Sequence, residues 1–325
     1  MQRFKNILLV LGESGFKGTA IQNGIHLART NNARLTAVAF IHSDNGGQFY
    51  KTSSAGHNEI EHMLIRERQK EIEQSLVDAG IDIDVDVQIL AGKEFIEIIR
   101  YVQRENIDLV IKEVEEDKRF AAMFFGSTDL RLLRKCPCPL WLVNPEAAAM
   151  NAKILAAVEL EAIDDEGQLN ELNQQIIEIS SSLAFQEKSE LHLVNAWIVF
   201  QGGRLAKKLS KQYREDIEAW VNEQKLNITA AQSGFCNVFK DHLEKKGLQD
   251  LDYTYHFPEG IAEDQIIDLA ERLDIDLVVM GTVARTDLAG FLVGNTSEAI
   301  LSKIKCSVLA IKPPGFVSPV GDENR

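Results

Sequence analysis

The chain has 325 residues, of which 45% are hydrophobic and 26% charged, an ordinary composition for a globular protein. Its formal net charge of −14 argues against nucleic acid as a partner, because phosphate backbones are bound by basic surfaces. No stretch is long and apolar enough to span a bilayer, so no membrane partner is expected. With four cysteines and no apolar signal core between Met1 and Val10, we expect free thiols and a cytoplasmic location.

The first half of the chain alternates short apolar runs with helical patterns. Strands are predicted at residues 7–11, 35–41, 81–90, 108–111 and 140–143. Helices are predicted at 19–29, at 57–79, after Gly92 and from near Ser127. Strands that alternate with helices predict a parallel sheet covered on both faces, with ligands bound at the carboxyl ends of the strands.

The second half repeats this order. Strands are predicted at residues 153–158, 191–197, 253–257, 277–280 and 308–311. Apolar residues at helical spacing predict two helices, one carrying Leu169, Leu172, Ile176 and Leu183, the other Ile266, Leu269, Ala270 and Leu273. The long polar stretch 204–246 is expected to hold one or two helices, with a break near Gly234.

The two halves are copies of one unit. At a constant offset of 168 residues, Gly126 falls on Gly294 and Cys138 falls on Cys306 without a gap. We therefore expect an α/β protein with two tandem doubly wound (Rossmann-like) domains, 1–148 and 149–325, each with a five-stranded, mainly parallel sheet. The last strands, 140–143 and 308–311, are the expected edges through which the domains pair as an internal pseudo-dimer.

The stretch 275–312 is the strongest candidate for a binding site. A buried strand ends at Gly281, a glycine-bearing loop follows, and Asn295 precedes Glu298 by three residues. This is the spacing of a capping box, so we expect a helix to begin at Asn295 with that residue as its cap. A strand, a loop and a helix N-terminus in this order hold phosphates in many proteins, through free backbone N–H groups and the helix dipole.

These residues resemble the universal stress protein family. Its nucleotide-binding members carry G-x2-G-x9-G-(S/T) after the fourth strand, and this chain reads Gly281-Thr-Val-Ala284, nine residues, then Gly294-Asn295-Thr296. The tandem arrangement, together with Leu191-His-Leu-Val-Asn-Ala-Trp197, is similar to the E subgroup of the family. The resemblance covers nearly the whole chain.

The resemblance implies that ATP with magnesium binds in the second domain. The residues implied to line the pocket are Val158, Glu159, Met280, Gly281, Val283, Ala284, Gly294, Asn295 and Thr296. Three of them depart from the family pattern: Ala284 replaces a glycine, Asn295 replaces serine or threonine, and Glu159 replaces an aspartate.

The first domain departs further from the pattern. Glu113 and Glu116 stand where the two loop glycines would be, and Gly12 stands at the acidic position after the first strand. Two carboxylates facing a triphosphate would repel it. We therefore expect the first domain to have lost nucleotide binding.

The pair Cys136-Pro-Cys138 could be a metal or redox motif, but no further ligands stand at zinc-like spacing. Cys138 aligns with Cys306 at the start of a buried strand, so we interpret the cysteines as small apolar residues and expect no metal site. The chain contains no recognisable nucleophile elbow, Walker loop or paired-carboxylate motif, so no catalytic residue is expected.

The resemblance implies a non-enzymatic regulatory protein that contributes to resistance to stress, including DNA damage. Its expected partners are a small-molecule ligand, other proteins and a second tandem chain. Two alternatives stay open: a weak ATPase or nucleotide-transferring enzyme using the same pocket, and a binder of a non-nucleotide, apolar ligand. The stretch 204–246 is longer than its counterpart in the first half, which makes it a candidate for a function specific to the subgroup.

Overall fold

A computed structural model describes residues 3–41, 55–114, 125–147, 153–159, 169–199, 211–282 and 294–321. The chain forms two compact units, one joining Met1–Ala152 with Asp276–Arg325 and the other comprising Lys153–Ile275. These units follow spatial contacts and not the repeat, so the division into domains 1–148 and 149–325 stays a prediction.

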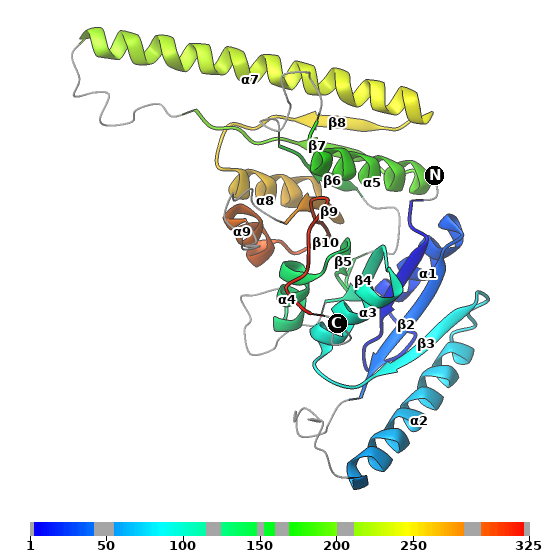
Figure 1. Cartoon of the computed structure of the whole chain (residues 1–325). Coiled ribbons are helices and arrows are strands. Elements are labelled where there is room, and N and C mark those ends of the chain that lie inside the picture. Colours follow the sequence, from blue (N-terminus) through cyan, green and yellow to red (C-terminus); the bar gives the residue numbers. More distant parts are fainter. Residues whose placement is uncertain are drawn as a thin grey trace. The chain divides into compact units, whose positions relative to one another are not determined.

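The first unit is a sheet with helices, in which the strand order is β3-β2-β1-β4-β5-β10-β9 (Figure 1). Its neighbouring strands run parallel, except that β5 and β10 are antiparallel. Central strands such as β1 and β4 are almost fully buried, because helices cover the sheet. The elements are β1 (Asn6–Val10), α1 (Thr19–Asn31), β2 (Arg34–Phe40), α2 (Ala55–Asp78), β3 (Val85–Leu90), α3 (Glu94–Glu105), β4 (Leu109–Glu113), α4 (Ser127–Lys135), β5 (Leu140–Val143), β9 (Leu277–Gly281), α9 (Asn295–Lys303) and β10 (Ser307–Ile311).

The second unit contains three parallel strands in the order β6-β7-β8. Its elements are β6 (Ile154–Ala157), α5 (Glu171–Glu187), β7 (Leu191–Val194), α7 (Lys211–Lys246), β8 (Tyr253–His256) and α8 (Ala262–Leu273). The α/β class and the mainly parallel sheet predicted from the sequence are confirmed.

The predicted pairing of the two last strands is also confirmed. Leu309 of β10 lies opposite Trp141 of β5, and the two strands run antiparallel. Arg134 of α4 forms an ion pair with Glu298 of α9 beside them. The last strands of the two repeats therefore lie side by side in one sheet.

Several predicted elements differ in extent from those observed. The strand expected at 191–197 ends at Val194, and the helix expected to carry Leu169 begins at Glu171. The strand expected at 81–90 begins only at Val85, which pairs with Leu35, the second residue of β2, so residues 81–83 lie beyond the start of β2. Helix α7 continues through Gly234 without a break. A glycine inside a helix costs about 1 kcal/mol, and the burial of Phe235 and Phe239 next to it offsets that cost. Residues 204–210 of the predicted stretch lie outside the described residues.

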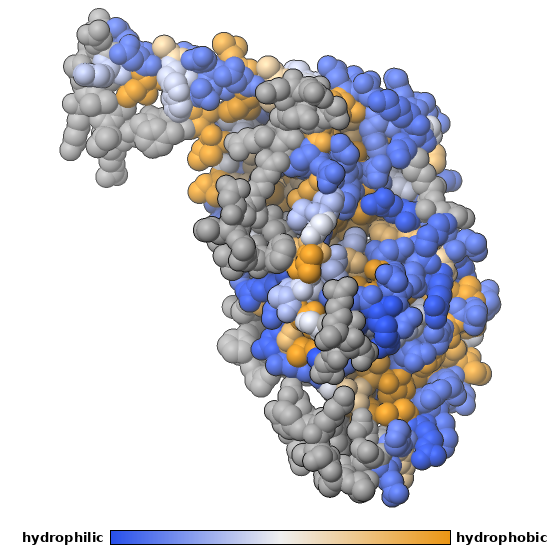
Figure 2. All heavy atoms as spheres, viewed as in Figure 1, coloured by the Kyte–Doolittle hydropathy of each residue, from blue (hydrophilic) through white to orange (hydrophobic). Residues whose placement is uncertain are grey.

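Helix α7 is anchored by aromatic packing in its second half. The ring centroids of Phe239 and Tyr253 lie 5.1 Å apart, and those of Phe235 and Tyr255 lie 6.0 Å apart, both edge to face. The first half of α7 extends past β8 (Figure 1), and both polar and apolar side chains line the helix (Figure 2). Large apolar side chains there, including Leu226 at 71% exposure, are solvent-accessible.

Two histidines meet on adjacent strands of the second unit. His192 Nδ1 of β7 lies 3.1 Å from His256 Nε2 of β8. Burial lowers the pKa of both rings, and the charge of His192 lowers the pKa of His256 further. Glu190 opposes the shift at His192, and Arg272 adds to the shift at His256. The pair is therefore neutral in the folded protein at pH 7.

We expect acid to destabilise the second unit through this pair. The unfolded histidines titrate near pH 6.5, whereas the folded pKa values of His192 and His256 are lower. The unfolded chain therefore takes up protons first, and stability is lost as the pH falls below about 6.5. Thermal unfolding between pH 7.5 and 5 should show this loss, and His256→Phe should reduce it. An equal loss in the variant would show that other groups are responsible.

Candidate functional site

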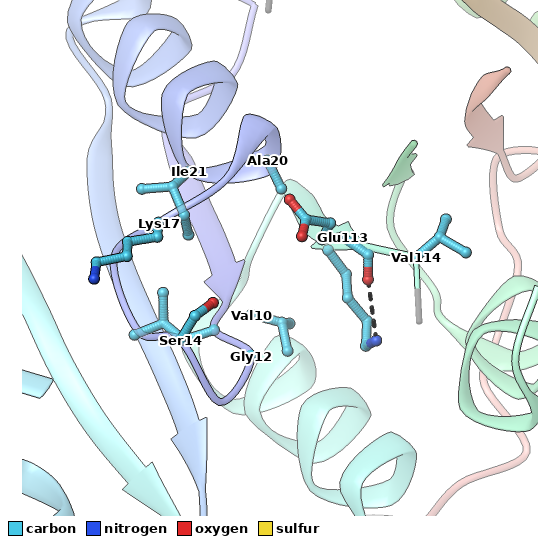
Figure 3. A pocket seen from close by; sticks show the side chains of 10 residues that line it. Val10, Gly12, Ser14, Lys17, Ala20, Ile21, Glu113 and Val114 are labelled. Carbon is cyan, nitrogen blue, oxygen red and sulfur yellow. Dashed lines mark hydrogen bonds between the residues drawn. The ribbon is translucent and has the colours of Figure 1, made fainter. Parts of the chain in front are cut away.

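A small cavity lies at the carboxyl ends of β1 and β4 in the first repeat (Figure 3). In the sheet, β2 lies on one side of β1 and β4 lies on the other. The carboxyl ends of β1 and β4 therefore form the switch point where open α/β sheets bind ligands. The cavity has a volume of about 70 Å³. Its lining residues are Val10, Leu11, Gly12, Ser14, Lys17, Ala20, Ile21, Lys112, Glu113 and Val114.

Glu113 directs its carboxylate into this region, toward Ala20 at the start of α1 (Figure 3). Its Oε2 atom is buried and has no hydrogen-bond partner among the described residues. Gly18 has a φ of +108°, and a Cβ atom there would clash with Glu113 Oε2. Glycine is thus needed at position 18 both for its backbone conformation and for the close approach of the carboxylate.

Lys112, one of the residues that line the cavity, belongs to a buried ion pair. Lys112 Nζ lies 3.2 Å from Asp129 Oδ1 and 3.9 Å from Glu94 Oε1, and the Lys112 and Asp129 side chains are only 3% and 1% exposed. Asp129 Oδ2 accepts a hydrogen bond from the Gly126 amide, 3.2 Å away, at the N-terminus of α4. The place where a helix N-terminus would receive an anion is therefore occupied by the carboxylate of Asp129.

The second repeat differs at both matched positions. At the offset of 168 residues, Met280 stands for Lys112 and Ser297 stands for Asp129. Ser297 Oγ donates to the Gly281 carbonyl oxygen over 3.0 Å, across the end of β9. The two repeats thus share a backbone arrangement, but Ser297 brings no negative charge to the helix N-terminus.

The two ends of the loop between β9 and α9 are joined by a hydrogen bond. The Gly294 amide donates to the Thr282 carbonyl oxygen over 3.2 Å. The helix begins at Asn295, as predicted, but the predicted cap is wrong, because Gly294 occupies the N-cap position and Asn295 is the first helical residue. Glu298 cannot complete a box with an asparagine cap and instead pairs with Arg134.

The residues expected at the end of β6 belong to the second unit. Val158 is buried, and its amide donates to the Val194 carbonyl oxygen over 3.0 Å. Glu159 has an exposed side chain, while its amide donates to Asn173 Oδ1 and its carbonyl oxygen accepts from Asn173 Nδ2 at 2.6 Å. Asn173 of α5, which sequence reasoning missed, therefore holds the strand end in position. A polar residue on the apolar face of a predicted helix was the available signal.

The predicted pocket residues are divided between the two units. Val158 and Glu159 lie in the second unit, whereas the residues near β9 and α9 lie in the first. Met280 is buried in β9, Gly281 ends that strand, and Thr296 is exposed in the first turn of α9. Val283 and Ala284 lie outside the described residues, as does Glu116 of the first repeat.

Two properties of the described part of the chain bear on the expected partners. No helix in it combines the length and the apolar character needed to cross a bilayer. The same residues contain no group of three or more histidine, cysteine or acidic side chains arranged to hold a metal ion.

The fold is that of a tandem α/β protein whose two repeats carry different chemistry at the same strand ends. Comparison with known families gives a match to the universal stress protein family over residues 3–144 and again over 150–312. The chain belongs to this family, with two copies of its domain.

Relatives with the same tandem arrangement align along the whole chain. Universal stress protein E of Photorhabdus laumondii is 27% identical over 98% of both chains, and that of Escherichia coli strain K12 is 28% identical over 98% of both. A crystal structure of a protein of unknown function from Pseudomonas aeruginosa PAO1 is similar with a TM-score of 0.64 and 25% identity, covering 96% of this chain and 94% of its own. A universal stress protein from Archaeoglobus fulgidus, 16% identical over 95% of this chain and 99% of its own, shares the fold with a TM-score of 0.61. The chain is thus a tandem protein of the universal stress protein E type.

Proposed function

We propose that this stress-family protein is a cytoplasmic, non-enzymatic binding module that contributes to resistance to stress such as DNA damage. Membership of the family and full-length similarity to universal stress protein E support the stress-response role. The absence of a Walker lysine or catalytic motif from the sequence favours binding over turnover.

The proposed ligand is ATP with magnesium, held in the second repeat only. The observation that carries this proposal is the contrast at matched positions. In the first repeat Asp129 accepts from the Gly126 amide, and Glu113 adds a second carboxylate at the strand end, whereas the matched Gly294 amide donates to the uncharged carbonyl oxygen of Thr282. In the second repeat Ser297 and Gly281 replace these acids, so a triphosphate would meet no carboxylate at either position.

Calorimetry with ATP and magnesium tests the proposal, and we expect one site per chain. Gly294→Val should weaken binding, because a side chain at the N-cap would obstruct an anion at the helix N-terminus. Gly126→Val is the matched control in the first repeat, and it should leave the affinity unchanged. Both glycines have negative φ, so neither change strains the backbone. Absence of ATP binding by the unmodified protein, or equal weakening by both variants, would contradict the proposal.

Two other experimental outcomes would favour a different function. Steady ATP hydrolysis above background that is lost on altering Glu159 or Gly281 would favour a weak ATPase or nucleotide-transferring enzyme. A co-purifying apolar compound, detected by mass spectrometry of the native protein, would favour a non-nucleotide ligand.

A module without its own activity must act through other molecules. We therefore include protein partners and a homodimer of tandem chains in the proposal. Sedimentation of the purified protein with and without ATP would show whether two chains associate.

A further inference from the structure

Two cysteines lie side by side at the end of α4. Cys136 is the C-cap of the helix, and its Sγ atom lies 3.7 Å from Cys138 Sγ. Each cysteine precedes a proline, Pro137 or Pro139, which favours an extended backbone at the cysteine. In an extended segment residues i and i+2 face the same side. The order Cys-Pro-Cys-Pro therefore holds the two thiols together before β5 begins.

A buried lysine adds positive charge close to this pair. Lys312, which directly follows β10, donates from Nζ to the Leu133 carbonyl oxygen and, over 2.7 Å, to Thr282 Oγ1. Burial lowers the pKa of Lys312 to about 8. The hydrogen bond from Cys138 and the charge of Lys312 lower the pKa of Cys136, whereas burial raises the pKa of Cys138. The charge of Lys312 therefore favours the ionised form of the Cys136 thiol.

The second repeat shows that its fold does not require this pair. At the offset of 168 residues, Ile304 stands for Cys136 and Cys306 stands for Cys138. Cys306 has no second thiol two residues before it, and burial raises its pKa to about 12. The same turn is therefore built with one cysteine in the second repeat and with two adjacent cysteines in the first.

We propose that Cys136 and Cys138 form a redox-active dithiol that hydrogen peroxide converts to a disulfide. In the first step, Cys136 Sγ attacks one peroxide oxygen and the O–O bond breaks. The second oxygen leaves as hydroxide and takes up a proton to become water, which leaves a sulfenic acid on Cys136. Cys138 Sγ then attacks Cys136 Sγ, the S–O bond breaks, and the hydroxyl leaves as water with the proton of Cys138.

The stoichiometry of this reaction and the burial of the two thiols both favour hydrogen peroxide as the oxidant. The two thiols lose two electrons and two protons, and one peroxide is reduced to two water molecules. Cys136 is fully enclosed and Cys138 retains 8% exposure, so a bulky disulfide reagent cannot reach them without local opening. Peroxide is close to water in size, and it is therefore the oxidant we expect to act on the folded protein.

Peptide mapping of the full chain tests the inference without any substitution. The native protein is treated with hydrogen peroxide, remaining thiols are blocked with an alkylating reagent after unfolding, and the peptides are analysed by mass spectrometry. We expect the peptide with Cys136 and Cys138 to lose two hydrogen atoms and to resist alkylation until it is reduced with dithiothreitol. Cys306 should stay fully alkylated. Full alkylation of both Cys136 and Cys138 after peroxide treatment would overturn the proposal.

Variants separate the two roles. Cys138→Ser should stop the reaction at the sulfenic acid, which dimedone traps on Cys136, whereas Cys306→Ser should leave disulfide formation unchanged. The charge of Lys312 lowers the pKa of Cys136, so Lys312→Met should slow the oxidation. Trapping on Cys306 in place of Cys136, or a disulfide that forms equally in Cys138→Ser, would reject the assigned pair.

Discussion

Replacing Lys112 with methionine is expected to lower the free energy of unfolding of the first unit by about 3–5 kcal/mol, because a buried charge loses its partner. Lys112 Nζ lies 3.2 Å from Asp129 Oδ1, and both side chains are almost fully enclosed. Methionine has a similar length, so the lost packing is small and the unpaired carboxylate dominates the cost. Urea unfolding followed by circular dichroism measures the change.

The second repeat supplies the control for this experiment. It has Met280 and Ser297 at the positions of Lys112 and Asp129. The double variant Lys112→Met, Asp129→Ser therefore installs a combination that the same backbone already accommodates, and it leaves no buried aspartate. We expect it to regain most of the stability lost in the single variant. A double variant that is as unstable as the sum of the two single variants would show that the ion pair is not the cause.

Replacing Phe239 with alanine should destabilise the second unit by about 3–5 kcal/mol, the usual cost of removing a large buried aromatic side chain. Phe239 is fully buried and contacts the rings of Tyr253 and Tyr255, with centroids 5.1 and 6.0 Å away. Its loss leaves a cavity between α7 and β8, so this half of α7 should detach first on heating. Thermal unfolding, with near-ultraviolet dichroism as the probe of the tyrosines, would report the loss.

Leu226→Ala in the same helix is the matched control. Leu226 is 71% exposed on the half of α7 that extends past β8, so its truncation should change stability by less than about 0.5 kcal/mol. Equal losses from Phe239→Ala and Leu226→Ala would mean that the exposed half of α7 is covered in solution. In that case the helix would be a contact surface and not only an extension of the packed core.

Helices and strands with a strong pattern of apolar residues were predictable, because burial of those residues stabilises both the element and its packing. Helix α3 presents Phe95, Ile98, Ile99 and Val102 on one face, and all four are buried as expected. Strand β5 was predicted with its observed bounds, since its apolar run is enclosed by its neighbours. The extent of β3 was not predictable in the same way, because a strand continues only where its neighbour β2 offers backbone groups to pair with.

The strand end and the helix start of the candidate site were predictable from the sequence, whereas the contacts of its side chains were less so. The glycine pattern placed Gly281 at a strand end and Asn295 at the start of a helix, and both positions are observed. The cap was misassigned, because the spacing of Asn295 and Glu298 also suits a helix whose cap is Gly294. The role of Asn173 depends on α5 packing beside the end of β6, and its local signal, a polar residue on the apolar face of a predicted helix, does not identify the partner.

The duplication, the α/β class and the loss of loop glycines from the first repeat were determined by the sequence alone, because each is a property of residue order. Only the tertiary structure decided what replaced the lost glycines. Glu94, Lys112 and Asp129 are far apart in the sequence, yet in the fold Lys112 Nζ lies within 4 Å of both carboxylates. The Asp129 carboxylate also accepts a hydrogen bond from the Gly126 amide at the start of its own helix. Lys312 likewise reaches the turn that holds Cys136 only because β10 pairs with β5. Long-range strand pairing and the cost of leaving a buried charge unpaired are the physical reasons for both arrangements.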